Sequence, residues 1–169
     1  MPSLFKLLGF TLFSTLLAHA VPATPKFPEV IPGAGLPSLE SLGLTSAELY
    51  MRVPTPLQIK TLEARFNILC GEVPPACSVA DAVACSNFLA ALGTTACTVN
   101  GENVMFCTAG PCNWFGSNIS GGPSASSFCS DVATGGNVVI NTCQGNGFVD
   151  GANAANGNGN LIVTISGES

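Results

Sequence analysis

The sequence predicts an α+β fold, a disulfide-stapled two-layer α/β sandwich in which two helices lie on an antiparallel sheet. Three observations predict it. The chain of 169 residues begins with the pattern of an export signal, its eight cysteines all fall between residues 70 and 143, and helical and strand-like stretches alternate after residue 66. This combination is typical of small secreted domains that disulfides hold together.

The N-terminus has the pattern of a secretory signal peptide. Lys6 supplies a positive charge, residues 7–18 form an apolar run, and Ala18-His19-Ala20 has the small-x-small pattern of a cleavage site. The run is shorter than the about 20 apolar residues that a membrane-spanning helix needs. We therefore expect cleavage after Ala20 and a secreted, extracellular product with no membrane span.

Residues 21–65 have the composition of a pro-segment. Six prolines in residues 21–54 make an independent core unfavourable. A short helix is still expected at residues 46–52, because Thr45 and Glu48 have the spacing of a capping box.

A candidate processing site ends this segment. A second short helix is expected from Pro56, and its last residues, Leu62-Glu63-Ala64-Arg65, resemble the Leu-x-x-Arg maturation sites of secreted fungal proteins. The alternative is an ordinary exposed arginine on an amphipathic helix. All Lys and Arg residues lie at or before Arg65 and all cysteines after it, which favours cleavage. We predict a signal peptide (1–20), a pro-segment (21–65) and a cysteine-rich domain (66–169).

The cysteines predict four disulfides. In an exported chain an even, closely spaced set is typical of a disulfide framework. A zinc site is the alternative, but the shortest spacing joins Cys107 to Cys112, and the one histidine of the chain lies in the signal segment. We expect no metal and no other cofactor. Eight cysteines can be paired into four bridges in about 100 different ways, and the sequence does not choose among them. The eight residues are Cys70, Cys77, Cys85, Cys97, Cys107, Cys112, Cys129 and Cys143.

The cysteine-rich domain begins with a predicted helix and a predicted hairpin. Ser78 has the character of an N-cap and Asp81 that of a first-turn acid, and apolar residues follow at helical spacing until Gly93. Cys85 is expected on the buried side of this helix. Residues 95–99 and 102–108 then flank Asn100-Gly101, the favoured type I′ turn pair, and predict a β-hairpin.

Two strands and a helix are expected in the rest of the domain. Residues 113–116 predict a third strand, and the β-branched residues 161–165 predict a closing one. Residues 124–143 have a helical pattern that Gly135 and Gly136 interrupt, and we expect a break or kink there because glycine costs about 1 kcal/mol in a helix interior.

Catalysis is not expected. Residues 66–169 contain six acidic residues but no Lys, Arg or His, so the usual bases that activate serine or cysteine nucleophiles are missing. An acidic hydrolase would need two of Asp131, Asp150 and Glu102 to meet about 5–10 Å apart, and solubility is the better explanation of these acids. Residues 144–160 superficially resemble a calcium loop, but they offer one carboxylate, and a mobile turn explains their Asn and Gly residues better.

Three residues are candidates for modification or binding. Asn118 opens the sequon Asn118-Ile119-Ser120, a candidate glycosylation site. Trp114 and Phe115 are candidates for stacking on a sugar ring or a partner, although a lone tryptophan in such a domain belongs more often to the core. A domain without cations does not neutralise phosphates, so we expect no nucleic-acid partner and no anionic membrane partner.

The region from Cys85 onward resembles small secreted fungal proteins related to smut-fungus killer toxins and to necrosis-inducing effectors of plant pathogens. The resemblance covers about half of the chain, and the order of its elements is more specific than any one of them. It implies a disulfide-held α/β sandwich, secretion, and action on other cells or host tissue. Channel block by the killer toxins is associated with a basic surface residue, which residues 66–169 do not contain, so no functional residue is carried over. The matching stretches are residues 85–93, 114–116, 129–133, 140–143 and 159–163.

These expectations combine into one functional hypothesis. The chain is expected to be a monomeric secreted fungal effector or toxin-like protein, not an enzyme, that acts on host or competitor cells through a protein or another cell-surface component. The alternative is a cell-wall or glycan-binding module.

Overall fold

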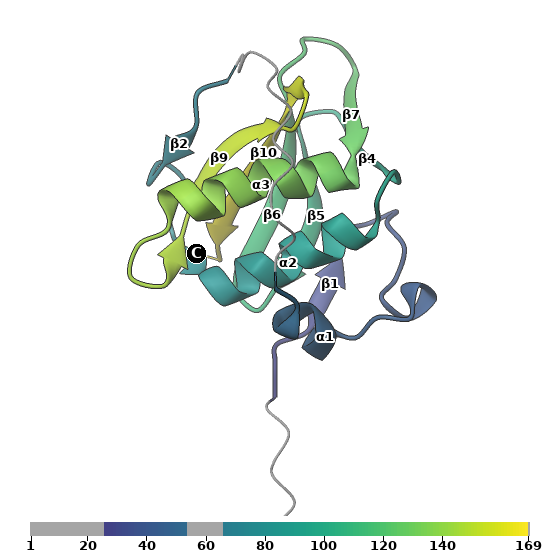
Figure 1. Cartoon of the computed structure of the whole chain (residues 1–169). Helices are drawn as coiled ribbons and strands as arrows, with labels where there is room; N and C mark the ends of the chain where they lie inside the picture. The colour runs from purple at the N-terminus through teal and green to yellow at the C-terminus, as the bar shows by residue number, and fades with distance from the viewer. Residues whose placement is uncertain (1–25, 54–65, 169) are drawn as a thin grey trace, which may run out of the picture.

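The computed structural model describes residues 26–53 and 66–168 (Figure 1). The signal peptide, the helix expected from Pro56 and the cleavage sites at Ala20 and Arg65 lie outside the described residues. The centre of the described part is a six-stranded sheet in which every pairing is antiparallel. Its strands, in spatial order, are β1 (Val30–Pro32), β5 (Asn103–Ala109), β6 (Cys112–Asn118), β10 (Asn158–Gly167), β9 (Gly151–Ala155) and β2 (Leu69–Cys70).

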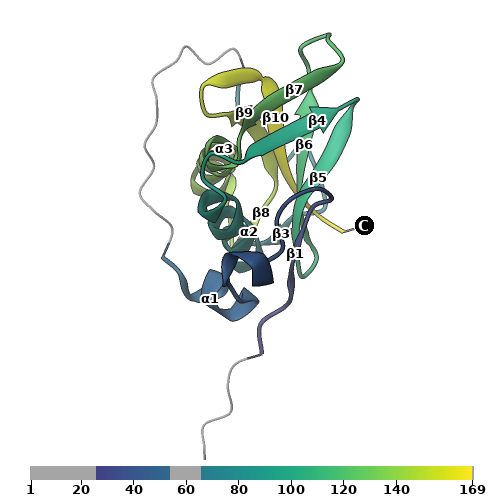
Figure 2. The same ribbon diagram turned by 90° about the vertical axis from the view of Figure 1, so that its right-hand side faces the viewer.

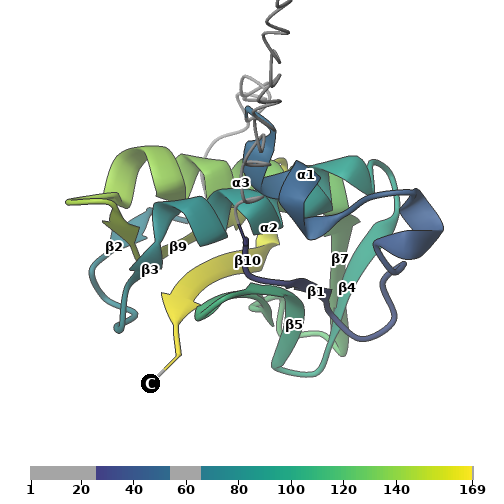
Figure 3. The ribbon, with the colours of Figure 1, turned by 90° about the horizontal axis from the view of Figure 1, so that it is seen from below.

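Two helices, α2 (Val79–Ala91) and α3 (Cys129–Cys143), lie side by side on one face of this sheet (Figures 2 and 3). Two smaller antiparallel sheets complete the domain, one formed by β3 (Cys77–Ser78) and β8 (Phe148–Val149), the other by β4 (Ala96–Asn100) and β7 (Ser124–Phe128). The predicted α+β sandwich, with an antiparallel sheet and two helices held by disulfides, is confirmed.

The start of α2 is as predicted. Ser78 is the N-cap, and its Oγ accepts a hydrogen bond from the Asp81 backbone N–H at 3.1 Å. Most of the apolar residues that follow are buried and Val83 is half-buried, while Cys85 is fully buried as predicted. The helix therefore forms where capping and apolar spacing agree.

The predicted hairpin around Asn100-Gly101 is wrong. The two strands form, but β4 pairs with β7 and β5 pairs with β1 and β6. A type I′ turn needs positive φ at both central residues. Gly101 has φ 91°, whereas Asn100 does not have positive φ. The chain therefore leaves one sheet at this turn and enters another.

The predicted break in the second helix is also wrong, since α3 is continuous through Gly135 and Gly136. Both glycines are needed for close packing. A Cβ at Gly135 would lie 2.4 Å from the carbonyl oxygen of Ala154, and one at Gly136 would lie 2.1 Å from the ring of Trp114. The sheet approaches the helix so closely that any larger residue at these positions collides with it.

The four predicted disulfides are present, and no cysteine is free. Two of them tie α2 and the chain before it to the β5–β6 hairpin, and one ties α3 to β4. The last joins the edge strand β2 to the end of α3, so each layer is bonded to the other. The pairs are Cys70–Cys143, Cys77–Cys112, Cys85–Cys107 and Cys97–Cys129.

Segment 26–53, part of the predicted pro-segment, packs against the cysteine domain. It supplies the edge strand β1, the short 3₁₀ helix η1 (Glu40–Leu42) and the helix α1 (Ser46–Met51). The predicted capping box of α1 is confirmed, because Thr45 and Glu48 exchange their hydrogen bonds. Val30 and Leu49 join the common core. The composition of the segment did not predict this packing.

No helix in the described ranges is long and apolar enough to cross a membrane.

Candidate functional site

The face of the six-stranded sheet that points away from the helices is the main candidate surface. Its orientation follows from Trp114, whose ring lies against Gly136 of α3. Because side chains alternate along a strand, the neighbours of Trp114 in β6, Asn113 and Phe115, point to the opposite face. Within the described residues, no helix or strand covers that face when the molecule is seen from the side (Figure 2) or from below (Figure 3). We call it the open face.

Strand register places two rows of side chains across the open face. Phe115 is paired with Met105 of β5 and with Thr164 of β10, and Thr164 is paired with Ala152 of β9. The other row contains Asn113, which is paired with Thr108 and Ser166, and Thr108 is in turn paired with Ile31. Cross-strand partners lie on one side of a sheet, so both rows belong to the open face. Phe115 in the first row is half-buried, whereas Asn113, Ser166 and Ala152 are themselves buried.

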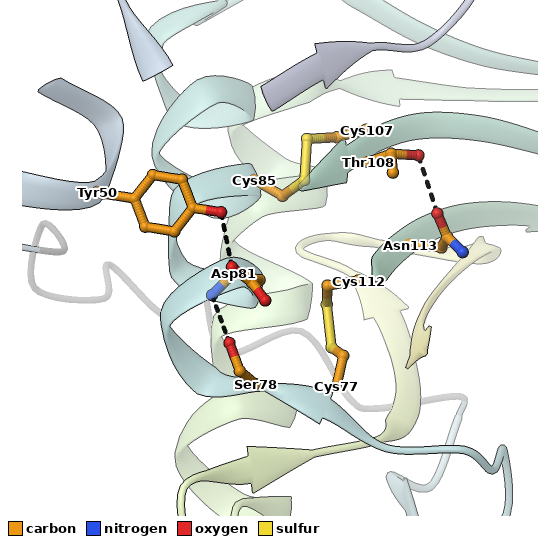
Figure 4. The surroundings of a disulfide bond; sticks show 9 residues. All are labelled: Tyr50, Cys77, Ser78, Asp81, Cys85, Cys107, Thr108, Cys112 and Asn113. Carbon is orange, nitrogen blue, oxygen red and sulfur yellow. Dashed lines mark hydrogen bonds between the residues drawn. A yellow bond between two sulfur atoms is a disulfide. The ribbon is translucent and has the colours of Figure 1, made fainter. Parts of the chain in front are cut away.

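The open face carries no charge. None of the six strands contains an Asp, Glu, Lys, Arg or His residue. The polar side chains are hydroxyls and amides, and some bond to each other: the Thr108 hydroxyl donates to the Asn113 side-chain oxygen at 2.9 Å (Figure 4). Neutral donors and acceptors beside the half-buried Phe115 suit a neutral partner, and salt should screen such binding little.

Trp114 is not part of this surface, so its assignment as a candidate binding residue is wrong. Its side chain is fully buried between sheet and helix. Among the described residues its Nε1 is the buried side-chain polar atom without a hydrogen-bond partner. The alternative reading, in which the lone tryptophan belongs to the core, is confirmed. Phe115, the other candidate, does lie on the open face.

The structure does not bring Asp131 and Asp150 together. Asp131 lies in the first turn of α3, where it accepts a hydrogen bond from the Asn156 side chain at 3.3 Å. Asp150 precedes β9 and accepts from the Val73 backbone N–H at 3.3 Å. The strand between residues 150 and 156 spans about 20 Å, whereas paired glycosidase carboxylates need about 5–10 Å. Glu102 lies exposed in the turn before β5.

Residues 144–160 form β8, β9 and the start of β10, so the expected mobile turn is wrong. The amides of this stretch bond within the protein. The Asn156 side chain binds Asp131, and the Asn158 side chain donates to the Ser126 carbonyl at 2.8 Å. Over the described ranges, no group of three or more His, Cys, Asp or Glu residues is placed to hold a metal ion.

The sequon residue Asn118 ends β6. Its side-chain oxygen accepts hydrogen bonds from the backbone N–H and the hydroxyl of Ser120, and its Nδ2 donates to the Gly122 carbonyl at 2.9 Å. Residues 119–123 are exposed. The site is therefore at the surface, and its glycosylation stays a prediction.

A cluster of polar side chains joins α1 to α2, and it was not predicted from the sequence. The Tyr50 hydroxyl donates to Asp81 Oδ1 at 2.6 Å (Figure 4), and the Asn87 Nδ2 donates to the carbonyls of Leu49 and Arg52 at 2.8 and 3.1 Å. Burial, and next the hydrogen bond to the Asp81 carboxylate and its charge, raise the pKa of Tyr50. One signal was present in the sequence: Asn87 is a polar residue in the middle of an otherwise apolar helix face.

Comparison with known proteins assigns the domain to a family. No curated protein and no solved structure matches the chain. A family model, described as a domain of unknown function, matches residues 65–167, more than half of the chain. The match includes all four disulfides and the strands β2 to β10, and it leaves out segment 26–53. The chain therefore belongs to the family of the domain of unknown function DUF8794.

Proposed function

We propose that this protein is a secreted effector or toxin-like protein that acts on host or competitor cells by binding a protein or another cell-surface component, without catalysis. The open face is the observation that carries the proposal. Its strands carry no charged residue, and two disulfides, Cys70–Cys143 and Cys85–Cys107, join this sheet directly to the helices. Such a rigid surface suits recognition, because little conformational entropy is lost on binding.

Two further observations support secretion and maturation. Four disulfides are typical of extracellular proteins, and the N-terminal residues have the pattern of a signal peptide. The family match begins at residue 65, beside the composition break at Arg65. Cleavage after Ala20 and then after Arg65 would release a domain that keeps every cysteine.

Activity on living cells tests the proposal directly. The full chain, secreted from a eukaryotic host and purified, is applied to plant leaves and to cultures of competing fungi. We expect tissue collapse, an immune response or growth inhibition in at least one of them. N-terminal sequencing of the same sample checks processing, and a start at residue 66 is the expected result. No response in any assay would contradict the proposal.

A matched pair of variants assigns the response to the open face. Phe115→Thr removes the aromatic ring from that face and keeps a residue that favours strands. Phe148→Thr makes the same change at an exposed phenylalanine of β8, away from the six-stranded sheet. We expect a weaker response for the first variant and an unchanged one for the second, at equal thermal stability. Equal loss in both variants would show that the open face is not the binding surface.

Binding to a cell-wall glycan is the second candidate function. The favouring observation is Phe115 beside neutral hydroxyl and amide side chains, a combination that can stack on a sugar ring and bond to its hydroxyls. Pull-down of the purified protein on chitin, β-glucan and host wall material tests it. Phe115→Thr should weaken retention about fivefold, equivalent to about 1 kcal/mol, and Phe148→Thr should leave it unchanged. Absence of retention on all three materials would exclude this candidate.

A further inference from the structure

Segment 26–53 is held on the cysteine domain by contacts alone. All four disulfides join residues between 70 and 143, so none reaches the segment. Its covalent connection to the domain is the main chain through residues 54–65. A single cut in that stretch would turn the segment into a separate peptide on the surface of the domain.

The first contact is strand addition at the edge of the sheet. β1 pairs antiparallel with β5, with Val30 opposite Ala109, and the backbone N–H of Gly33 donates to the Phe106 carbonyl at 2.8 Å. β1 has three residues and β5 has seven. A Cβ at Gly33 would lie 2.0 Å from the carbonyl oxygen of Met105. The edge of β5 is therefore filled by a short strand whose fit depends on a glycine.

The second contact is made with α2. Leu49 of α1 is fully buried in the common core. Around it, the segment supplies hydrogen-bond partners to two buried polar side chains of α2. The Tyr50 hydroxyl donates to the Asp81 carboxylate, and two backbone carbonyls accept from the Asn87 amide. If the segment left, both side chains would lose these bonds, and the edge of β5 would be unpaired.

The contact needs no charge on the segment. Its charged residues, Lys26, Glu29, Glu40, Glu48 and Arg52, are all exposed. The surface beneath it therefore recognises an extended backbone, an apolar anchor and a hydroxyl donor rather than ionic groups. This is the chemistry of β-strand addition, in which main-chain bonds give affinity and side-chain fit gives specificity.

We propose that the edge of β5 and the adjoining side of α2 form a strand-docking site of which segment 26–53 is the removable occupant. A cut between residues 53 and 66 makes this occupant exchangeable, and the site then takes an extended, uncharged strand of a target protein that offers a hydroxyl to Asp81. The identity of the target rests on the proposed function, whereas the exchange of the segment does not.

Peptide exchange tests the docking site. A recognition sequence for a site-specific protease is inserted within residues 54–65 of the full chain, and the purified protein is compared before and after cutting. The probe is a fluorescent synthetic peptide with the sequence of residues 26–53. We expect the probe to bind the cut protein and not the uncut one. After the cut, segment 26–53 can dissociate from the domain and leave β5 unpaired. When no free peptide is present, amide hydrogen exchange of β5 should therefore be faster in the cut protein than in the uncut chain.

Peptide variants test the contacts without altering the folding of the domain. Tyr50→Phe should weaken probe binding about 10-fold, since it removes a hydrogen bond to a carboxylate. Gly33→Val should weaken it more, because its side chain meets the backbone of β5. Met51→Ala, at a position that is 64% exposed, is the control and should bind like the unchanged peptide. Absence of exchange in the cut protein, or equal binding by all peptides, would overturn the docking site.

Activity separates this proposal from the proposed function. Excess free peptide 26–53 should suppress the cellular response to the cut protein, because it occupies the site that the target needs. A response that persists at saturating peptide would overturn the target part of the proposal. If neither form of the protein causes a response, the proposed function fails, and the exchange experiment still decides whether the docking site exists.

Discussion

The cysteine domain and segment 26–53 share one core but are stabilised in different ways. The domain is crossed by four disulfides that join residues 22 to 73 positions apart. The segment contributes a three-residue strand, a six-residue helix and two fully buried apolar side chains, with no disulfide. Short elements are marginal by themselves. We therefore expect the free energy of opening to be large for the domain and small for the segment.

Removing a disulfide should have the largest effect. Cys70→Ala combined with Cys143→Ala opens the longest loop, for which the chain-entropy model gives a loss of about 4 kcal/mol in the free energy of unfolding. Cys70 is exposed, so little cavity cost should be added. Denaturant unfolding under non-reducing conditions measures it. A loss below about 1 kcal/mol would mean that β2 and α3 are held together by packing, as the segment is.

The same substitution in the two regions should have different consequences. Leu89 of α2 and Leu49 of α1 are both fully buried, and Leu→Ala at such sites costs about 2–5 kcal/mol. At Leu89 the loss should lower the stability of the whole domain. At Leu49 the destabilisation should affect only the docking of segment 26–53, so it cannot exceed the free energy of releasing the segment. Hydrogen exchange distinguishes them: Leu49→Ala should expose β1 and α1 and leave α3 protected. If α3 lost as much protection as β1 and α1, the segment and the domain would unfold together as one cooperative unit.

The Tyr50–Asp81 bond gives the segment a dependence on alkaline pH. Because the pKa of Tyr50 is raised in the folded protein, the stabilisation that the Tyr50–Asp81 bond gives the segment is complete at pH values below the pKa of an unfolded tyrosine, about 10. It is lost as pH rises from there through the higher folded-state pKa. Tyr50→Phe removes a bond worth about 1–2 kcal/mol and should abolish this dependence. Segment opening followed by hydrogen exchange between pH 9 and 11 checks it; an unchanged pH profile in Tyr50→Phe would contradict the role of the bond.

Local signals in the sequence were reliable, and signals that depend on distant partners were not. The caps at Thr45 and Ser78 were predicted because each cap and the residue it binds lie within three positions. The pairing of β4 with β7 was missed because it joins residues about 30 apart and the Asn100-Gly101 turn pointed to a local hairpin. The glycines of α3 were read as breakers because their function depends on Trp114 and Ala154, which are distant in the sequence.

The candidate sites were predicted less completely than the fold. Phe115 and Trp114 were predicted together, yet strand alternation places the half-buried Phe115 on the open face and buries Trp114 on the opposite face. The sequence alone did not show which of the two would point to which face. The open face combines side chains from the strands of the six-stranded sheet, which lie far apart in the sequence, and no short motif indicates it. Segment 26–53 was judged by its prolines, although Pro32 fits at the sheet edge, where a missing N–H does no harm.

The smallest effect is expected at the cap of α1. Thr45→Ala removes the side chain that accepts from the Glu48 N–H, and loss of such a cap costs about 1 kcal/mol. The hydrogen bonds to the backbone and side chain of Thr45 lower the pKa of Glu48 in the folded protein. The Glu48 carboxylate therefore stabilises α1 at pH values above the pKa of an unfolded glutamate, and this stabilisation is lost as pH falls through the lower folded-state pKa. Thr45→Ala should therefore loosen α1 at neutral pH and flatten its response to acid, measured by hydrogen exchange of residues 46–51 between pH 3 and 6. The control inside the cysteine domain is Thr98→Ala, at a half-buried threonine of β4 that bonds to Ser126. If α1 and β4 responded equally to acid, the cap would have no special role, and the difference in stability between the two regions would have to come from the disulfides alone.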